Sequence, residues 1–253
     1  MNIELEMSIG DKVWVLKDYK IQEATIESVV EEIVPVVQQL CKDYEIILVN
    51  DGSTDRTGEI GQSLAQRIPN FQLVEHFPNR HYGGALKAGF TKATKELIAF
   101  FPADKQFVFS EIDRLLAELQ SADIISGYRA HRQDNLIRRF NGFGWNTVVR
   151  MLFGYLCRDI DCGFKLFRRE ILEHVKLVSD GASFDTELLA GAKARGYRIA
   201  EVKVTHLPRS AGKATGADLM VIARAFCDLP RFRLRLNQEL REEKQARARG
   251  GGK

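Results

Sequence analysis

Residues 45–68 read EIILVNDGSTDRTGEIGQSLAQRI, and this stretch decides the fold. It opens with the apolar, β-branched run Glu45–Val49, which predicts a short buried strand. Asn50-Asp51-Gly52 then supplies the residues of a tight turn, and residues 55–68 have the pattern of a helix that Thr54 or Asp55 can cap. A strand that passes through a turn straight into a helix is the building unit of an α/β fold.

The same alternation of strand and helix patterns continues along the chain. Because the connections are short, it predicts a mostly parallel sheet covered by helices, in a single α/β domain over residues 1–230. No linker rich in Pro, Gly or Ser precedes the last residues, and residues 231–253 form a basic tail. The further predicted strands are Phe71–Phe77, Leu97–Phe101 and Ala122–Tyr128, and the further predicted helices are Glu23–Leu40 with a kink at Pro35, Gly84–Thr94 and Ser110–Leu119.

The overall composition is that of an ordinary globular protein. Of the 253 residues, 45% are hydrophobic, and the net charge of +3 is too small to indicate a nucleic-acid partner. The four cysteines are scattered without a Cys-x-x-Cys pair, so we expect reduced thiols in a cytoplasmic protein. We find neither a signal-peptide pattern nor an apolar run of the roughly 18–20 residues that a membrane span needs.

The tail carries a charge of its own. Residues 231–253 hold eight Lys or Arg and three Glu, a net charge of +5, and the apolar run Leu219–Leu229 precedes them. One interpretation is a basic amphipathic segment that lies on an anionic membrane surface. The other is a solvated helix end that frays into Gly250-Gly251-Gly252. The sequence leaves both interpretations open.

Three charged residues follow predicted strands. Asp51, Asp104 and Arg129 each come soon after one, and ligands of open α/β sheets bind beyond the carboxyl ends of the strands. A carboxylate at Asp51 can accept hydrogen bonds from a base or a ribose, and Asp104 beside Gln106 can hold a hard cation that bridges two phosphates. The simpler alternatives are a capped turn at Asp51 and, at Asp104, a turn carboxylate paired with Lys105.

A second helix start contains a pair of glycines. In Asn79–Gly89 the pair Gly83-Gly84 would let a ligand approach the backbone, and Arg80 or Lys87 could meet a phosphate. The spacing differs from that of a Walker loop. No Gly-x-Gly-x-x-Gly follows the first strand, which argues against a nicotinamide dehydrogenase.

Residues 157–168 read CRDIDCGFKLFR and combine two carboxylates with a cationic, aromatic run. Asp159 and Asp161 would be poor core material, because an unpaired buried charge is costly. The segment suits an anionic ligand that bears a metal ion or a phosphate. The alternative is a salt-bridged loop.

Together these segments resemble the family 2 glycosyltransferases, in particular the branch of dolichyl-phosphate and polyprenyl-phosphate sugar synthases. The resemblance covers Glu23–Leu229. It depends on the order and spacing of several segments, each of which is weak alone: Val49–Asp55, Asn79–Gly89, Gly127–Arg129, Arg158–Lys165, Glu187–Leu189, Glu201–Val202 and His206–Arg209.

The resemblance implies a GT-A type, Rossmann-like fold that transfers a sugar, with inversion, from a nucleotide-diphosphate donor. It implies a divalent cation, Mg²⁺ or Mn²⁺, at Asp104. Asp51 would bind the nucleoside, and Asp104 with Gln106 would match the motif for the metal and the diphosphate. The donor-binding set that we carry over is Asp51, Gly52, Ser53, Asn79, Gly84, Lys87, Asp104 and Gln106.

For the acceptor, the resemblance implies a polyprenyl or dolichyl phosphate, which a peripheral protein would meet at the cytoplasmic face of a membrane. Asp161 would lie near the reacting sugar. Asp185 or Glu187 would take the place of a general base, which a hydroxyl acceptor needs and a phosphate does not. The basic residues implied to hold the acceptor phosphate are Arg129, Arg138, Arg139 and Arg209.

Two departures from the family pattern keep other functions open. Pro102 stands in place of the first Asp of the usual Asp-x-Asp, which leaves Asp104 alone, and Trp14–Glu23 lacks the usual Pro and Asn. The alternatives are a non-catalytic module that binds a nucleotide sugar, a glycosyltransferase with a hydroxyl acceptor and, less favoured, a nucleotidyltransferase.

Overall fold

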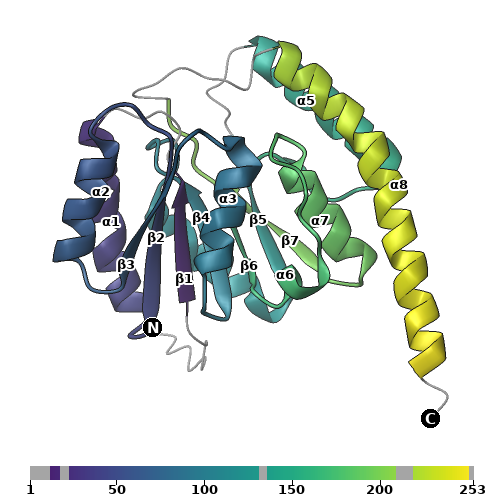
Figure 1. Cartoon of the computed structure of the whole chain (residues 1–253), viewed down its shortest axis with the longest axis horizontal. Coiled ribbons are helices and arrows are strands. Elements are labelled where there is room, and N and C mark those ends of the chain that lie inside the picture. Colours follow the sequence, from purple (N-terminus) through teal and green to yellow (C-terminus); the bar gives the residue numbers. More distant parts are fainter. Residues whose placement is uncertain (1–11, 18–22, 131–135, 209–218, 251–253) are drawn as a thin grey trace.

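The computed structural model describes residues 12–17, 23–130, 136–208 and 219–250. They form a seven-stranded sheet in the order β3-β2-β1-β4-β6-β5-β7, with helices on both faces (Figure 1). The strands are β1 (Lys12–Lys17), β2 (Tyr44–Asp51), β3 (Phe71–His76), β4 (Leu97–Pro102), β5 (Ile124–Arg129), β6 (Lys165–Arg168) and β7 (Ile199–Val204). The helices are α1 (Glu23–Leu40), α2 (Thr57–Arg67), α3 (His81–Lys92), α4 (Ile112–Ala117), α5 (Leu136–Phe153), α6 (Ile171–His174), α7 (Phe184–Ala194) and α8 (Leu219–Gly250), and the 3-10 turns η1 (Phe109–Glu111) and η2 (Glu118–Gln120) flank α4.

Six of these seven strands run in the same direction. β1 pairs in parallel with β2 and β4, β2 with β3, and β5 with β7, whereas β6 is antiparallel to both β4 and β5. The predicted mostly parallel sheet is therefore confirmed. The alternation of patterns did not predict β1, β6 or β7. Because β6 runs against the others, the loop that enters it lies at the edge where the other strands end.

The two faces of the sheet bury two apolar clusters. Successive side chains of β2 alternate between them, with Ile46 and Leu48 on one face and Ile47 and Val49 on the other. The first cluster also contains residues of α1, α2 and α4, and the second contains residues of α3, α5, α7 and α8. The result is a three-layer α/β/α arrangement that holds the strand ends in fixed positions.

The predicted bounds of the first two helices are close to those in the structure. α1 continues from Glu23 to Leu40 with Pro35 inside it, so the proline does not end the helix. Ile33 and Val37, on either side of Pro35, are fully buried, and this packing offsets the hydrogen bond that a proline removes. α2 begins two residues later than predicted, at Thr57, whose backbone N donates to Asp55 Oδ1 at 3.1 Å.

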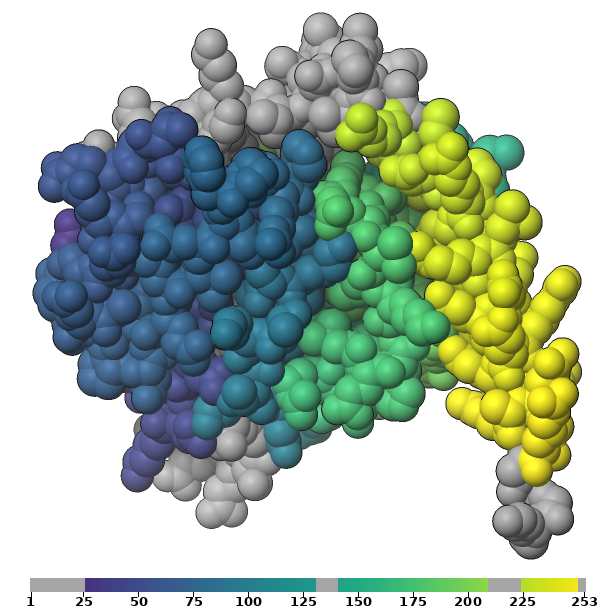
Figure 2. Space-filling model, in the orientation of Figure 1, coloured from purple at the N-terminus to yellow at the C-terminus, as the bar shows by residue number. Residues whose placement is uncertain are grey.

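α8 extends across the predicted boundary between residues 230 and 231. It runs beside α5 along one side of the molecule, where the rings of Phe153 and Phe232 stack with centroids 5.1 Å apart (Figure 1). Phe232 and Leu236 are buried, so the first turns of the predicted tail pack against the domain. The last turns extend past the other elements (Figure 2). Among the helices of the described part of the chain, none is long and apolar enough to cross a membrane.

Candidate active site

Four of the predicted site residues lie at the edge where the parallel strands end. Asp51 is the last residue of β2 and Arg129 the last of β5, while Asp104 follows the end of β4 by two residues. The loop with Asp161 enters β6 at this same edge. A Cβ on Gly163 would lie 2.6 Å from Pro102 Cγ, so this loop packs directly on the end of β4. The topology thus brings segments from both halves of the chain to one edge.

Asp51 is buried and is tied to the loop that precedes α3. Its Oδ1 accepts a hydrogen bond from the backbone N of Arg80 at 2.8 Å and lies 3.3 Å from His76 Nδ1. Its carbonyl oxygen accepts one from Asn79 Nδ2 at 2.6 Å. Gly52 has φ of +75° and approaches Asn79 so closely that a Cβ would lie 3.0 Å from the Asn79 backbone N. A larger residue at Gly52 would therefore disturb both turns.

Asp104 and Gln106 connect the end of β4 to the end of β7. Both are buried, and the backbone N of Gln106 donates to Asp104 Oδ1 at 3.1 Å. Gln106 Nε2 lies 3.4 Å from His206 Nε2. The backbone carbonyl oxygen of Gln106 accepts a hydrogen bond from the backbone N of Leu207 at 2.8 Å. The alternative pairing of Asp104 with Lys105 is not seen, because Lys105 Nζ contacts Ser28 Oγ.

In the ranges that the structure describes, no three His, Cys, Asp or Glu side chains gather closely enough to hold a metal ion. A cation bound at Asp104 would therefore need other ligands from its substrate or from water.

Asp159 forms a salt bridge, as the alternative interpretation of its loop predicted. Its two oxygens accept from Arg129 Nε and Nη2, both at 2.6 Å, and Oδ2 also accepts from the Arg129 backbone N at 3.2 Å. Burial alone would lower the pKa of Arg129, but the hydrogen bonds and charge of Asp159 raise it well above its usual range. Arg129 is thus a fixed cation at the edge, with its Nε and Nη2 groups directed at Asp159.

Asp161 differs from Asp159 because its side chain is exposed. Desolvation by the surrounding protein first, and then the negative charges of Asp185 and Asp159, raise its pKa to about 7, while the positive charges of Arg129 and Lys165 oppose this rise. A solvent-accessible carboxylate with a raised pKa is typical of an active site.

Asp185 and Glu187, the predicted general bases, are both buried in α7 and are both held by protein groups. Asp185 Oδ1 lies 2.7 Å from Lys165 Nζ, and its Oδ2 accepts from the Tyr82 hydroxyl at 2.6 Å. Glu187 Oε2 accepts from the backbone N of Val178 and of Ser179, and its Oε1 from Arg235 Nη2 at 2.7 Å. Each oxygen already has a partner, so this geometry suits a positioning role better than proton transfer with a substrate.

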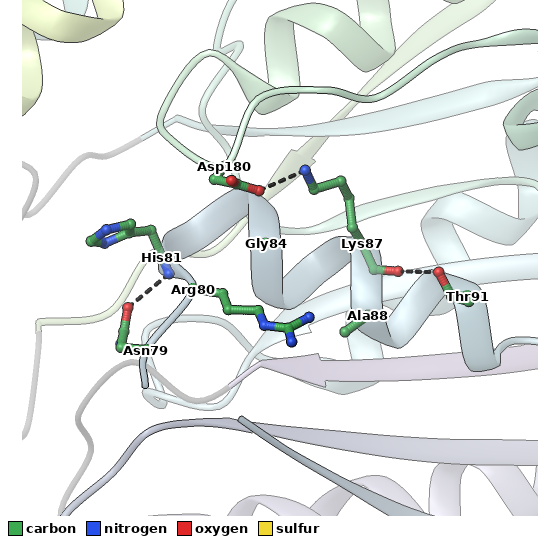
Figure 3. Close-up of a pocket in the computed structure, with 8 residues that line it drawn as sticks. All are labelled: Asn79, Arg80, His81, Gly84, Lys87, Ala88, Thr91 and Asp180. Carbon is green, nitrogen blue, oxygen red and sulfur yellow. Dashed lines mark hydrogen bonds and ion pairs between the residues drawn. The ribbon is translucent and has the colours of Figure 1, made fainter. Parts of the chain in front are cut away.

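A hollow of about 570 Å³ lies along α3. In Figure 3 the Lys87 side chain points toward Asp180, and Arg80 lies beside the first turns of the helix; Lys87 Nζ is 2.6 Å from Asp180 Oδ1. Asn79, Gly84 and Lys87 line the hollow, as do Arg80, His81, Ala88, Thr91 and Asp180. Asp51, Asp104 and Asp161 do not line it. The residues predicted to bind the sugar donor therefore fall into two groups, one at the hollow and one at the strand ends.

The glycine pair has a structural use in this region. A Cβ on Gly83 would lie 2.3 Å from the carbonyl oxygen of Ser179, and the Gly83 backbone N donates to the Asp180 carbonyl at 2.8 Å. Gly83 thus lets residues 179–180 pack on the first turn of α3.

Four predicted residues remain. Ser53 donates its backbone N to Asn50 Oδ1 at 3.1 Å, which shapes the turn after β2. Arg138 and Arg139 fall at the start of α5, where the structure describes the backbone alone. Arg209 lies outside the described residues.

Comparison with known proteins places the chain in a family. The family model described as Glycosyl transferase family 2 matches residues 20–176, which is more than half of the chain. The chain belongs to glycosyl transferase family 2. The match spans β2, β4 and β5 and the loop with Asp161.

Curated relatives of this family 2 chain include undecaprenyl-phosphate 4-deoxy-4-formamido-L-arabinose transferases. That of Photorhabdus laumondii is 31% identical over 194 residues, which is 76% of this chain and 58% of the relative. That of Pectobacterium carotovorum is 30% identical over 204 residues, 79% of this chain and 61% of the relative. The chain thus spans about three fifths of the length of these relatives.

Among solved structures, glucosyl-3-phosphoglycerate synthase from Mycobacterium tuberculosis in complex with UDP is similar, with a TM-score of 0.68 and 17% identity over 88% of this chain and 80% of that one. The same enzyme with Mn²⁺, UDP and glucosyl-3-phosphoglycerate gives a TM-score of 0.67 and 18% identity, over the same shares of the two chains. These likenesses establish the shared fold, so the predicted GT-A type fold of this family 2 chain is confirmed.

Sequence reasoning assigned no role to Lys165, Tyr82 or Asp180, which make close contacts in the site. The sequence carries no signal for them. A lysine at the start of a short strand and a tyrosine in the first turn of a helix both have the pattern of surface residues, and their partners lie 20 and 103 positions away.

Proposed function

We propose that this family 2 glycosyltransferase moves a sugar, with inversion, from a nucleotide-diphosphate donor to a polyprenyl phosphate. The observation that carries the proposal is the placement of Asp51, Asp104 and Asp161 at one sheet edge in a chain of this family. The relatives support the proposed acceptor, because their names combine undecaprenyl phosphate with a sugar transferase.

The donor would bind across the ends of β2 and β4. Asp51 would accept hydrogen bonds from the nucleoside, while Asp104 and Gln106 would face the diphosphate. A divalent cation is part of the proposal, because similar solved structures carry Mn²⁺ or Mg²⁺ together with UDP. When bound, such an ion neutralises the charge that develops on the leaving diphosphate. The lone Asp104 carboxylate fits this role if the diphosphate oxygens supply further ligands.

The transfer itself requires an in-line approach. An oxygen of the acceptor phosphate attacks the anomeric carbon and forms the new C–O bond. The bond from that carbon to the donor's β-phosphate oxygen breaks, and the nucleoside diphosphate leaves with the electron pair. Asp161 would lie against the reacting sugar, and Arg138, Arg139 and Arg209, with the fixed cation of Arg129, would attract the acceptor phosphate.

A phosphate acceptor needs no general base, because it is already an anion. This agrees with the protein partners of Asp185 and Glu187, which leave no carboxylate oxygen of either residue without a hydrogen bond. The second candidate is a hydroxyl acceptor. The observation that favours it is the raised pKa of Asp161, about 7, since this value suits a general base near neutral pH.

The outward face of α8 is the surface that we propose to meet the membrane. Arg231, Leu234 and Arg241 share this face and are exposed, Leu234 by 71%. Cations beside an exposed apolar side chain suit an anionic lipid surface.

The test is a transfer assay with purified protein, undecaprenyl phosphate in detergent and a panel of nucleotide sugars, each with Mg²⁺, Mn²⁺ or a chelator. The product is identified by mass spectrometry, and its anomeric configuration by NMR. We expect one donor to glycosylate the lipid phosphate, with no product from undecaprenol. Glycosylation of alcohols instead would favour the hydroxyl acceptor. Tight binding of a nucleotide sugar by calorimetry without any turnover would favour the non-catalytic module.

A further inference from the structure

Lys165 is a charged side chain with no exposure at all. Its Nζ donates to the carbonyl oxygen of Ile160 at 2.9 Å, to that of Cys162, and to Asp185 Oδ1 at 2.7 Å. An ammonium group has three N–H donors, so all of them are used. The two carbonyls belong to the residues immediately before and after Asp161. The lysine therefore holds both sides of the turn that presents Asp161 at the sheet edge.

The ammonium group stays charged in this position. Burial alone would lower the pKa of Lys165, but the charge and hydrogen bond of Asp185 more than offset this, so the pKa is raised. Hydrogen bonds from a charged donor are about twice as strong as those between neutral groups. The turn around Asp161 is thus fixed by two strong bonds to its backbone, and Asp161 itself remains exposed to receive a ligand.

The other end of this network reaches α3. Asp185 Oδ2 accepts from the hydroxyl of Tyr82 at 2.6 Å, and the Tyr82 ring meets Phe184 edge-on with centroids 6.1 Å apart. Tyr82 lies in the first turn of α3, next to the loop that holds Asp51 through the backbone of Arg80. The hydrogen-bonded network Tyr82–Asp185–Lys165 therefore connects the part of the edge proposed to bind the nucleotide sugar to the turn that contains Asp161.

Stability alone gives a weak reason for such a buried pair. Replacing a buried ion pair by well-packed apolar residues of similar volume is often neutral or stabilising. What apolar side chains cannot supply is the pair of hydrogen bonds that fixes the carbonyls on either side of Asp161.

We propose that Lys165 is a positioning residue for the transfer reaction: it fixes the turn that holds the Asp161 carboxylate against the reacting sugar, and Asp185 and Tyr82 fix Lys165. The inference rests on the proposed function, because it assigns Asp161 to the sugar. A purely structural ion pair would lower the stability of the whole protein. A positioning residue also controls the geometry of this one turn.

The experiment compares full-length Lys165→Met and Lys165→Arg with the wild type. Hydrogen exchange measured by mass spectrometry follows the peptides that cover residues 157–168, under conditions where each variant is folded. We expect exchange in this segment to be about tenfold faster or more in Lys165→Met, since charge-assisted bonds to the backbone are lost. Exchange in α2 and β3 should stay unchanged. Lys176→Met is the matched control, because Lys176 is exposed.

The kinetic arm separates chemistry from binding. We expect kcat of Lys165→Met to fall about 100-fold, since a displacement of about 1 Å at a reacting group can cost that factor. The KM for the donor should stay within about twofold, and Lys165→Arg should recover part of kcat because it retains the charge. If Lys165→Met does not fold, Tyr82→Phe tests the same network by removing one hydroxyl, and we expect smaller changes in the same direction.

Unchanged exchange in residues 157–168 of a folded Lys165→Met protein would overturn the proposal, as would faster exchange with a normal kcat. A wild type that transfers no sugar would instead refute the proposed function, while the exchange arm would still decide whether Lys165 fixes the turn.

Discussion

Glu187 of α7 and Arg235 of α8 form an ion pair with a Glu187 Oε1 to Arg235 Nη2 distance of 2.7 Å. The Glu187 side chain is 4% exposed, and its other oxygen accepts from the backbone N of Val178 and of Ser179. Since Asp180 in the same loop pairs with Lys87, the contact links α8 to α3 through residues 178–180. Arg235 of α8 thus helps to hold the loop of Asp180, which lines the hollow along α3.

We predict that Arg235→Met destabilises the protein by about 1–3 kcal/mol, because it leaves the buried Glu187 charge with hydrogen bonds from backbone amides alone. Arg231→Met is the matched control. Arg231 is 80% exposed and pairs with Asp228 at 3.5 Å, so its loss should change stability by no more than about 0.5 kcal/mol. Urea unfolding measures both values. Equal effects of the two substitutions would refute a role for the buried contact.

Gly83→Ala should also destabilise the protein. The new Cβ would lie 2.3 Å from the carbonyl oxygen of Ser179, and backbone atoms cannot move aside cheaply, so we expect a loss of about 1–3 kcal/mol. Gly144→Ala, in the interior of α5, meets nothing within 4 Å and should stabilise by about 0.5–1 kcal/mol. Changes of opposite sign in the free energy of unfolding, measured with denaturant, would support the close packing of residues 179–180 on Gly83. A Gly83→Ala protein of unchanged stability would count against it.

The raised pKa of Asp161 predicts a pH-dependent effect of Asp161→Asn. The native carboxyl, with a pKa of about 7, binds its proton more tightly than the unfolded one does, so its contribution to stability is lost as pH rises from about 4 to about 7. Asparagine does not titrate. We therefore expect Asp161→Asn to unfold at a higher temperature than the wild type at pH 8, and the difference to shrink at pH 4.5. A difference that is the same at both pH values would show that the Asp161 pKa is not raised.

The same variant tests the role of Asp161 in transfer. We expect Asp161→Asn to bind the nucleotide sugar as the wild type does, because Asp51 and Asp104 are untouched, and to lose at least about 100-fold in kcat. Calorimetry measures the binding, and the lipid assay the transfer. Full activity in this variant would make the loop merely structural.

Asp104→Asn should remove the stabilisation that depends on a divalent cation. At a nucleotide-sugar concentration of 100 times its Kd, ligand binding stabilises a protein by about 2.7 kcal/mol. In the wild type, we expect part of this stabilisation to require Mn²⁺ or Mg²⁺. In the variant, we expect the stabilisation to be the same with and without the ion, as followed by thermal unfolding. Asp113→Asn, at an exposed position in α4, is the control. An unchanged response to the ion would remove Asp104 from the metal site.

The outward face of α8 predicts binding to anionic vesicles. Each cation near such a surface contributes about 1 kcal/mol, and the effect weakens with salt. We expect the protein to co-sediment with vesicles that contain phosphatidylglycerol, and the double variant Arg231→Gln with Arg241→Gln to bind more weakly. Equal binding to neutral and anionic vesicles would refute the electrostatic contact.

The sequence by itself determined the strands and helices whose patterns are local. The run Glu45–Val49 and its turn predicted β2 and α2, and the alternation of such units predicted a mostly parallel sheet. Because parallel strands end at one edge, the positions of Asp51, Asp104 and Arg129 in the chain were enough to place them together. The family was also readable, since its segments keep their order and spacing along the chain.

The tertiary structure alone decided which of the charged groups are held by protein partners. Asp159 pairs with Arg129, Asp185 with Lys165 and Tyr82, and Glu187 with Arg235, across separations of 20 to 103 residues. It also decided the antiparallel insertion of β6, the close approach to Gly83 and the packing of α8. The physical reason is that periodicity reports which side of an element is buried, whereas the identity of the partner depends on the three-dimensional packing of segments far apart in the sequence.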